Sequence, residues 1–481
     1  MEQSQMPLLD AMTAMKDRNL TPFDVPGHKR TGGVAQLAHF IGKKALAFDV
    51  NSMPMLDNLN YPTGVIAQAQ ALMADAYGAD HAFFTVNGTT SAVHAMLMSV
   101  CSPGDEILLP RNVHKSAINA LIMCDAMPVY MQAQVSNKLK FATGVTLETV
   151  KQSIAEHPRA KAIFLINPTY YGICSQLAEI TEYAHSKGLT VLVDEAHGAH
   201  FAFSDSLPVH AMACGADMVA VSIHKTGGAL TQSSVLLMKE GRVQKSAVQA
   251  TLNLLQTTSA SYLLMTSLDI ARHHMVQGGK AMLDRITVCA QQARERINTI
   301  DGLYAYGKEL IGTPGIYDFD ETKLGVNVAG LGLTGYEVYD LLLEDCNIQM
   351  ELADTHNVLA IVSMGDNDQS LNKLVSALKH IAFRYRRQRR EEIPAVPLKN
   401  PLVRITPRTA YYAEKTRVPL PEAAGRICAE SVMVYPPGIP ILAPGEEITQ
   451  EITEYLAFLK NQNAKLTDMS DPSLNTIKVI A

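Results

Sequence analysis

The chain has 481 residues, which is long for one compact domain, so two or three domains are expected. Hydrophobic residues make up 47% and charged residues 18%, as in ordinary globular proteins. The net charge of −6 argues against a nucleic-acid or anionic-membrane surface, because either needs a basic patch. It is compatible with a cationic small-molecule substrate.

The amino-terminal stretch MEQSQMPLLDAM has no basic segment followed by an apolar core, so no secretory signal is expected. No uncharged apolar run reaches about 18 residues, the length that a membrane-spanning helix needs. The seven cysteines are scattered and form no C-x-x-C pair. We therefore expect reduced thiols in a cytoplasmic protein, and no metal site.

The first 300 residues alternate between apolar runs and helical patterns. Helices are predicted after residues 87–90 as far as Val100, from Val113 to Cys124, and around Leu177, Ile180 and Ala184. Strands are predicted at residues 81–86, 106–109, 162–166, 190–193 and 218–222. Apolar strands separated by helices predict an α/β fold with a mainly parallel central sheet covered on both faces.

The pattern changes after residue 300. Strands are predicted at residues 324–328, 348–352 and 358–364, and helices at 336–344 and from about 370. The charge run RYRRQRREE at 384–392 reads as a solvated helix end and linker, since it is short and ends in acids. The expected domains are residues 1–300 (an N-terminal arm and major domain), 301–392 (a small α/β domain) and 393–481.

Polar residues follow three of the predicted strands, and ligands gather at the carboxyl ends of strands in an open parallel sheet. Asp194 comes directly after the apolar run at 190–193. A carboxylate there suits the pyridine nitrogen of pyridoxal phosphate (PLP), whose protonated ring accepts the electrons of a carbanion. Alone the signal is weak, because an acid at a strand end is more often a helix cap or a surface residue.

Lys225 follows the strand predicted at 218–222, one βα unit after Asp194. Its amine can form an imine with the aldehyde of PLP, and burial lowers the pKa of a lysine to help it exchange. Gly227 and Gly228 allow the backbone to pass close to a ligand. An isolated lysine would be taken as a surface residue, but the spacing from Asp194 favours the cofactor interpretation.

The segment Asn87-Gly88-Thr89-Thr90-Ser91 follows a strand and opens a helix. Backbone N–H groups and hydroxyls at a helix N-terminus suit a phosphate, although simple capping by Thr89 or Thr90 is equally compatible. His114 follows the next strand at the head of a helix, where an imidazole can stack on a pyridine ring. A lone histidine is more often structural.

Together these segments resemble the Orn/Lys/Arg decarboxylases, PLP enzymes of the aspartate-aminotransferase-like fold type I. More narrowly, the chain is similar to the short bacterial arginine decarboxylases, which lack an N-terminal wing domain. The resemblance covers essentially the whole chain. Its motifs are residues 23–29 (FDVPGHK), 110–116 (PRNVHKS), 167–170 (NPTY), 194–198 (DEAHG), 222–225 (SIHK), 230–234 (LTQSS), 435–440 (YPPGIP) and 444–446 (PGE).

The resemblance implies that Lys225 is the Schiff-base lysine, that Asp194 meets the pyridine nitrogen and that His114 stacks on the ring. It implies a homodimer or higher homo-oligomer in which Thr258 or Ser259 reaches the cofactor of the neighbouring subunit. The further cofactor contacts that it implies are Gly88, Thr89, Thr90, Ala196, His197, Ser222 and His224. One departure is Ala229, where related sequences lead us to expect serine, and no assigned role depends on it.

The implied reaction is decarboxylation of a basic amino acid, with L-arginine giving agmatine and CO2 for polyamine biosynthesis. Lysine and ornithine stay open, since pocket length is not readable from the sequence. Lys225 or His224 would return the proton to Cα. The distal cation of the substrate needs a carboxylate. The acids considered are Glu446, Glu447, Glu351 and Asp354, and a solvated acid is at least as good a reading for each.

Three weaker readings are weighed against this one. Arg404 and Arg408 are possible partners of the substrate α-carboxylate, although proline-flanked arginines often only pin a loop. A PLP aminotransferase would share Lys225 and Asp194, but the family motifs argue against it. A regulatory relative without cofactor is opposed by the intact set of Lys225, Asp194 and His114.

Overall fold

The computed structural model describes residues 1–481 except 31–32, 137, 388–399, 435–437 and 463. The described chain forms two compact units, and each contains segments that are far apart in the sequence. The first unit consists of Met1–Ser99, Val193–Asp205 and Val209–Leu283, and the second of Val100–Leu192, Ser206–Pro208 and Asp284–Ala481. The division at residues 300 and 392 stays a prediction, and its second boundary lies outside the described residues.

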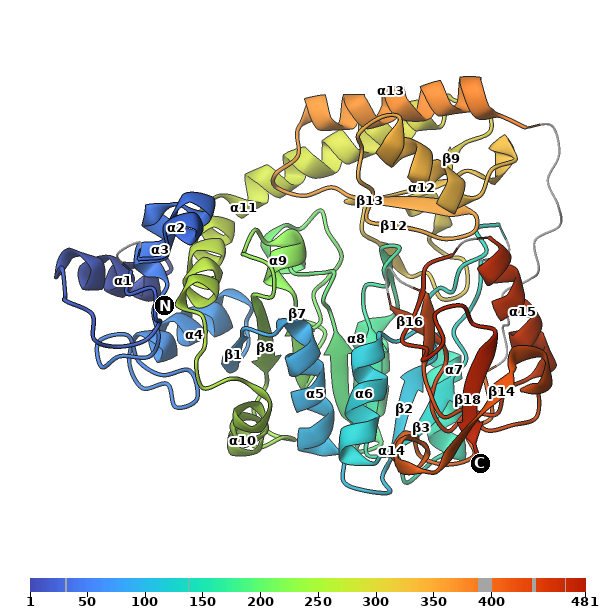
Figure 1. Ribbon diagram of the computed structural model, residues 1–481, viewed down its shortest axis with the longest axis horizontal. Helices are drawn as coiled ribbons and strands as arrows, with labels where there is room; N and C mark the ends of the chain where they lie inside the picture. Colours follow the sequence, from blue (N-terminus) through green and yellow to red (C-terminus); the bar gives the residue numbers. More distant parts are fainter. Residues whose placement is uncertain (31–32, 137, 388–399, 435–437, 463) are drawn as a thin grey trace. The chain divides into compact units, whose positions relative to one another are not determined.

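The first unit contains three strands of which β8 (Ser234–Met238) is the middle one. It runs antiparallel to both β1 (His81–Thr85) and β7 (Met218–Val221). α4 (Val65–Ala76) packs against β1, and α1 (Pro7–Asp17) packs against α4, both in blue in Figure 1. The other helices of this unit are α2 (Ala35–Ile41), α3 (Lys43–Phe48), α5 (Gly88–Val100), η1 (Phe201–Phe203), α9 (Ile223–Thr226) and α10 (Lys245–Leu255). α11 (Tyr262–Ile297) begins here.

The second unit contains a parallel group of strands. β2 (Glu106–Pro110) lies between β3 (Met127–Met131) and β4 (Ala162–Ile166) and is parallel to both. Its residues Ile107, Leu108 and Leu109 are fully buried, which explains the continuous apolar run in the sequence. The connecting helices are α6 (Lys115–Cys124), α7 (Leu147–Glu156) and α8 (Leu177–Ser186), and β6 (Thr190–Asp194) follows α8.

A smaller antiparallel sheet in the second unit has the order β12-β13-β11-β9. These strands are β9 (Tyr304–Ala305), β11 (Lys323–Asn327), β12 (Leu352–Ala353) and β13 (Asn357–Ile361). α12 (Gly335–Glu344) packs against β13, and α13 (Asp368–Tyr385), in orange in Figure 1, packs against α12. Short elements of this region are β5 (Ile173–Cys174), which pairs with β10 (Asp318–Phe319), η2 (Lys308–Leu310) and η3 (Ala329–Leu331).

The described residues from 400 onward form the red part of the ribbon in Figure 1. β15 (Val432–Val434) lies between β16 (Ile439–Leu442) and β17 (Leu466–Thr467), and β14 (Lys415–Pro419) pairs with β18 (Thr476–Ile480). The remaining elements are α14 (Pro407–Tyr412), η4 (Leu420–Glu422) and α15 (Gln450–Asn461). Buried side chains that include Val432, Leu442, Leu456 and Ile477 give this region an apolar core of its own.

Most predicted elements differ from the structure by only a few residues at their ends, and two differences concern how an element begins or pairs. In the segment predicted as a strand at 348–352, only Leu352 belongs to β12, and Glu351 adds one backbone hydrogen bond to Leu359 of β13. Asn347, just before this segment, has a φ of +52°. The helix predicted from Val113 begins at Lys115, since His114 is its N-cap in an extended conformation. Within the described residues, no helix combines the length and the apolar character needed to cross a bilayer.

Candidate functional site

The carboxylate of Asp194 and the amine of Lys225 belong to the same unit. β6 ends at Asp194, and Lys225 lies in α9, directly after β7. Burial raises the pKa of Asp194, while the charge of Lys225 and the N–H of Ala196, which donates to Oδ1 at 3.1 Å, oppose the shift. A buried carboxylate of this kind gains most from a cationic partner, so it fits a protonated pyridine nitrogen.

Two histidines of the segment after β6 contact α9. The Nζ of half-buried Lys225 lies 2.9 Å from Nε2 of the buried His197. Nδ1 of His200 lies 3.1 Å from the hydroxyl of Thr226, the next residue along. The two histidines therefore contact Lys225 and the residue that follows it, and the lysine amine faces a ring nitrogen that can exchange a proton with it.

Hydroxyl groups meet where α5 begins. The hydroxyls of Thr89 and Ser222 hydrogen-bond to each other at 3.0 Å, and Ser222 is fully buried. Gly88 opens the helix with a φ of +69° and donates its N–H to the carbonyl of Gln232 at 2.9 Å. Thr90 follows Thr89 and is half-buried. A helix N-terminus with two converging hydroxyls fits a phosphate group.

His224 lies next to Lys225 in α9 and is half-buried. Its Nδ1 donates to the carbonyl of Ser233 at 3.1 Å. Burial lowers the pKa of His224, the Ser233 carbonyl opposes this shift, and the charge of Lys225 adds to it. The lowered pKa favours the neutral imidazole, whose Nδ1 carries the proton that is donated to Ser233.

Thr258 and Ser259 lie on the surface of the first unit, in the connection between α10 and α11. Gln256, just before them, is anchored to the strand β1. Its side chain accepts from the N–H of Val86 at 3.2 Å and donates to the carbonyl of Phe84 at 3.3 Å. The chain that leads to the two exposed hydroxyls is therefore anchored at Gln256.

His114 belongs to the second unit and caps α6. Its Nδ1 accepts a hydrogen bond from the N–H of Ser116 at 3.2 Å, so the ring is fixed to the backbone of the first helical turn. The N-cap bond uses only one edge of the imidazole, so it is compatible with ring stacking, which stays a prediction.

The predicted substrate acids are in different surroundings. Glu446 is 1% exposed and forms an ion pair with Arg111, with 2.9 Å between Nη2 and Oε2. Asp354 is half-buried and accepts from the hydroxyl of Tyr171 at 2.6 Å. Both acids have partners inside the protein, and their assignment to the distal cation of a substrate stays a prediction. Glu351 is exposed.

The other charged residues considered for the substrate also have partners. Glu447 forms an ion pair with Arg404. Arg408 donates to the carbonyl of Met123, the residue before the end of α6, at 2.8 Å. These contacts hold the C-terminal segment to itself and to α6, and they leave the α-carboxylate of a substrate without a demonstrated partner among these side chains.

Two buried charged residues that neighbour predicted site residues in the sequence were not anticipated. Glu195 is fully buried, accepts from the N–H of Ala211 at 2.8 Å, and has a pKa raised well above 4.5 by burial. The available signal was that Glu195 directly follows Asp194, the last residue of β6, because adjacent residues of an extended chain point to opposite sides. The second residue, Arg111, had no such signal, since its partner is distant in sequence.

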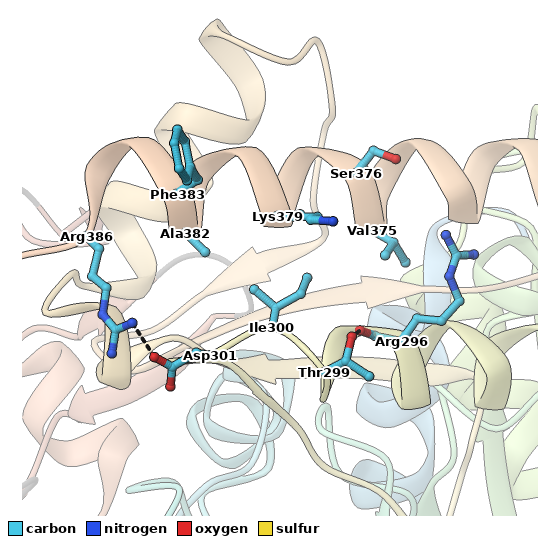
Figure 2. Close-up of a pocket in the computed structure, with 10 residues that line it drawn as sticks. All are labelled: Arg296, Thr299, Ile300, Asp301, Val375, Ser376, Lys379, Ala382, Phe383 and Arg386. Atoms are coloured by element: carbon cyan, nitrogen blue, oxygen red, sulfur yellow. Dashed lines mark hydrogen bonds and ion pairs between the residues drawn. The ribbon is translucent and has the colours of Figure 1, made fainter.

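Figure 2 shows a pocket beside α13 that contains none of the predicted site residues. Arg386 and Asp301 form an ion pair at one end of it. The lining residues are Arg296, Thr299, Ile300, Asp301, Val375, Ser376, Lys379, Ala382, Phe383 and Arg386. Among the described residues, no group of three or more His, Cys, Asp or Glu side chains is arranged to hold a metal ion.

Comparison with known proteins gives matches over almost the whole chain. Residues 6–330 match the model of the Orn/Lys/Arg decarboxylase major domain, and residues 393–468 match that of the C-terminal domain. An arginine decarboxylase of Bacillus subtilis (strain 168) is 45% identical, with 100% of this chain and 99% of the relative covered. Lysine decarboxylase LdcA of Pseudomonas aeruginosa is 26% identical, with 90% of this chain and 73% of the relative covered.

The fold is also shared with solved structures. The lysine decarboxylase LdcF of Francisella novicida superposes with a TM-score of 0.86 at 20% identity, covering 99% of this chain and 81% of that one. The architecture is that of PLP-dependent enzymes of fold type I, as the sequence predicted. The matches to both family domains and the identity over the full length lead to one conclusion: the chain belongs to the Orn/Lys/Arg decarboxylase family.

Proposed function

We propose that this protein decarboxylates L-arginine to agmatine and CO2 with PLP as its cofactor. The observation that carries the proposal is the presence, in one unit of a decarboxylase-family chain, of buried Asp194 and of Lys225, whose charge acts on that carboxyl group. Arginine is favoured over lysine because an arginine decarboxylase is 45% identical to this chain, against 26% for a lysine decarboxylase. The corresponding physiological role is polyamine biosynthesis.

Lys225, Asp194 and the start of α5 would hold the cofactor. Asp194 would meet the pyridine nitrogen, and Thr89, Thr90 and Ser222 would bind the phosphate. When bound, PLP supplies an electron sink for the carbanion that loss of CO2 leaves behind. The positions of Gly88, Ala196 and His197 in the same segments support contact with the same ligand, and His114 would stack on the ring.

The protein side chains would control where the protons are. His197 would accept the proton of the Lys225 ammonium across their 2.9 Å contact, because only the neutral amine is a nucleophile. Either Lys225 or the neutral His224 would then hold the proton that returns to Cα of the product. The low pKa of His224 supports this role, since a neutral imidazole can first accept the proton that it later donates.

Three further parts of the proposal concern the surroundings of the site. The exposed hydroxyls of Thr258 and Ser259 would reach the cofactor of a neighbouring subunit in a homodimer, in the cytoplasm. The exposed carboxylate of Glu351 would meet the distal cation, because Glu446 and Asp354 already have partners inside the protein. The chain would be divided into domains at residues 300 and 392.

The test is CO2 release by the purified protein with PLP, with arginine, lysine and ornithine offered separately, alongside an absorbance scan. We expect a visible band from the lysine-linked cofactor and CO2 from arginine. Lys225→Ala should lose the band and at least about 10³-fold in turnover, while the exposed control Lys187→Ala should keep both.

Other outcomes would revise the proposal in defined ways. CO2 from lysine or ornithine instead would replace the substrate and keep the reaction. A band without CO2 from any of the three would remove the decarboxylase assignment for these substrates. A Lys225→Ala variant with full activity would contradict the role of the lysine.

A further inference from the structure

The segment between β2 and α6 ends at His114 and contains a buried arginine. The guanidinium of Arg111 donates to the carboxylate of Glu446 at 2.9 Å and to the carbonyl of Pro440 at 2.8 Å. It also lies over the ring of Tyr130, with 5.2 Å between the guanidinium carbon and the ring centroid. Three contacts, two of them to the C-terminal segment, therefore fix the residue three positions before His114.

Glu446 is built into its own turn. Its Oε2 accepts a second hydrogen bond, from the N–H of Ala443 at 2.8 Å. The preceding Gly445 has a φ of +91°, and a Cβ there would lie 2.3 Å from the carbonyl oxygen of Ile405. A turn this tightly packed presents the carboxylate at one place, so Glu446 acts as a rigid partner for Arg111.

The backbone next to His114 is held in the same way. Lys115, the first residue of α6, donates its N–H to the carbonyl of Gly438 at 3.0 Å. Its ammonium forms an ion pair with Asp468 at 3.3 Å. The C-terminal segment therefore contacts the chain on both sides of His114.

The other end of α6 is bound by the same segment. The hydroxyl of Thr406 donates to the carboxylate of Asp125 at 2.7 Å, and Arg408 donates to the carbonyl of Met123 at 2.8 Å. α14, which contains Arg408, packs against α6. The C-terminal segment therefore contacts α6, the helix that His114 caps, at both of its ends.

We propose that the C-terminal segment positions His114 for the cofactor, and that the buried Arg111–Glu446 pair is the principal contact through which it does so. Arg111 and Glu446 are positioning residues that act through His114. The inference rests on the proposed function, in which His114 stacks on the ring of PLP. It assigns to Glu446 a purpose other than substrate binding.

The test uses Glu446→Gln in the full-length protein, which keeps the shape of the side chain and removes its charge. The matched control is Asp320→Asn, which removes the charge from the Lys323–Asp320 pair, a fully buried ion pair of the same unit with 3.1 Å between its atoms. We expect the dissociation constant of PLP to rise by about tenfold or more in Glu446→Gln and to stay within about twofold in the control. Both variants should melt at lower temperature.

A double-mutant cycle with His114→Ala tests whether the effect passes through the histidine. In the His114→Ala background, adding Glu446→Gln should change PLP affinity and the cofactor absorbance no further, because the residue being positioned is gone. An equally large loss in that background would overturn the proposal, as would a Glu446→Gln variant that binds PLP like the control. Failure of the proposed function would be recognised separately, because the Lys225→Ala variant would then keep its absorbance band.

A milder variant covers the case in which Glu446→Gln does not fold. Thr406→Ala with Arg408→Ala removes two contacts near the surface at the far end of α6. We expect the dissociation constant of PLP to rise about threefold in this variant. The same two substitutions should raise it no further in the His114→Ala background. PLP affinity that is unchanged in this variant, or that falls equally in both backgrounds, would overturn the proposal.

Discussion

Asp194 and Glu446 are both buried acids at the ends of apolar segments, and their cationic partners make them different. The charge of Lys225 acts on the carboxyl group of Asp194, and this lysine is half-buried and contacts His197. Glu446 is paired with Arg111, whose guanidinium is charged at any pH that the protein survives. Burial raises the pKa of both carboxyl groups, so burial alone does not distinguish them.

The difference lies in whether the partner can leave. A lysine can lose its proton and react, and a carboxylate beside it is then ready for another cation. An arginine with a carboxylate and a carbonyl as acceptors keeps its charge, so its acid always has a cationic partner inside the protein. An acid at a strand end or loop is therefore judged by its partner before it is assigned to a site.

The largest effect is expected from Arg111→Met, which leaves Glu446 buried without a counter-charge. Removing one partner of a buried ion pair costs about 3–5 kcal/mol of unfolding free energy, measurable as a lower urea midpoint. Asp301→Asn, which breaks the exposed pair with Arg386, should cost at most about 1 kcal/mol. Equal effects in the two variants would mean that the buried pair is no more important than a surface pair.

The next effect concerns Asp194, whose negative charge has to stabilise the protonated ring of the cofactor. Asp194→Asn should lower kcat by about 10²- to 10³-fold, measured as CO2 release. Glu195→Gln is the matched control, because burial raises the pKa of Glu195 well above its usual value and favours the uncharged form, and its kcat should stay within about threefold. A control variant as impaired as Asp194→Asn would show that charge at Asp194 is not the cause.

A smaller effect is expected at the proposed phosphate end of the first unit. Thr89→Ala removes one hydroxyl and leaves Ser222 without that partner, so the dissociation constant of PLP should rise by about tenfold. Equilibrium titration of the absorbance band measures it. Thr299→Ala, an exposed hydroxyl in the second unit, should leave the constant unchanged, and a shift there equal to that of Thr89→Ala would remove the assignment.

The pH dependence of the protein without cofactor is the most delicate test. Burial raises the pKa of Asp194 above its unfolded-state value of 3.8, so the native state binds this proton more tightly than the unfolded chain does. Its stabilising contribution is complete below pH 3.8 and is lost as the pH rises through the folded-state pKa. Asp194→Asn should reduce this decline in melting temperature, and a steeper decline in the variant would contradict the assigned direction.

The fold was predictable where burial is uniform along a segment. β4 has the predicted bounds, and β2 and β6 differ from the predicted strands by one residue at one end. The run of apolar residues was a sufficient signal because all but one residue of β2, all but one residue of β4 and every residue of β6 are buried. By contrast, α11 was not predicted, since Gly278 and Gly279 interrupt a helix of 36 residues that has no consistently apolar face.

The site was predictable only in part, for a physical reason. The motifs identified Asp194, Lys225 and Thr89, because residues that follow directly after strands lie where ligands gather in an open parallel sheet. The role of Glu446 was not readable, since it depends on a partner that lies 335 positions earlier in the chain. Contacts of that separation leave no periodic pattern in the sequence.

The same separation has a consequence for the protein during its synthesis. Arg111 leaves the ribosome 335 residues before Glu446, which at ordinary elongation rates is a delay of roughly 20 to 70 s. During that interval the nascent chain contains a guanidinium whose native acceptors, Glu446 and the carbonyl of Pro440, do not yet exist. The loop that ends at His114 is therefore completed among the last events of translation, and a chain that is truncated early leaves the ribosome without it.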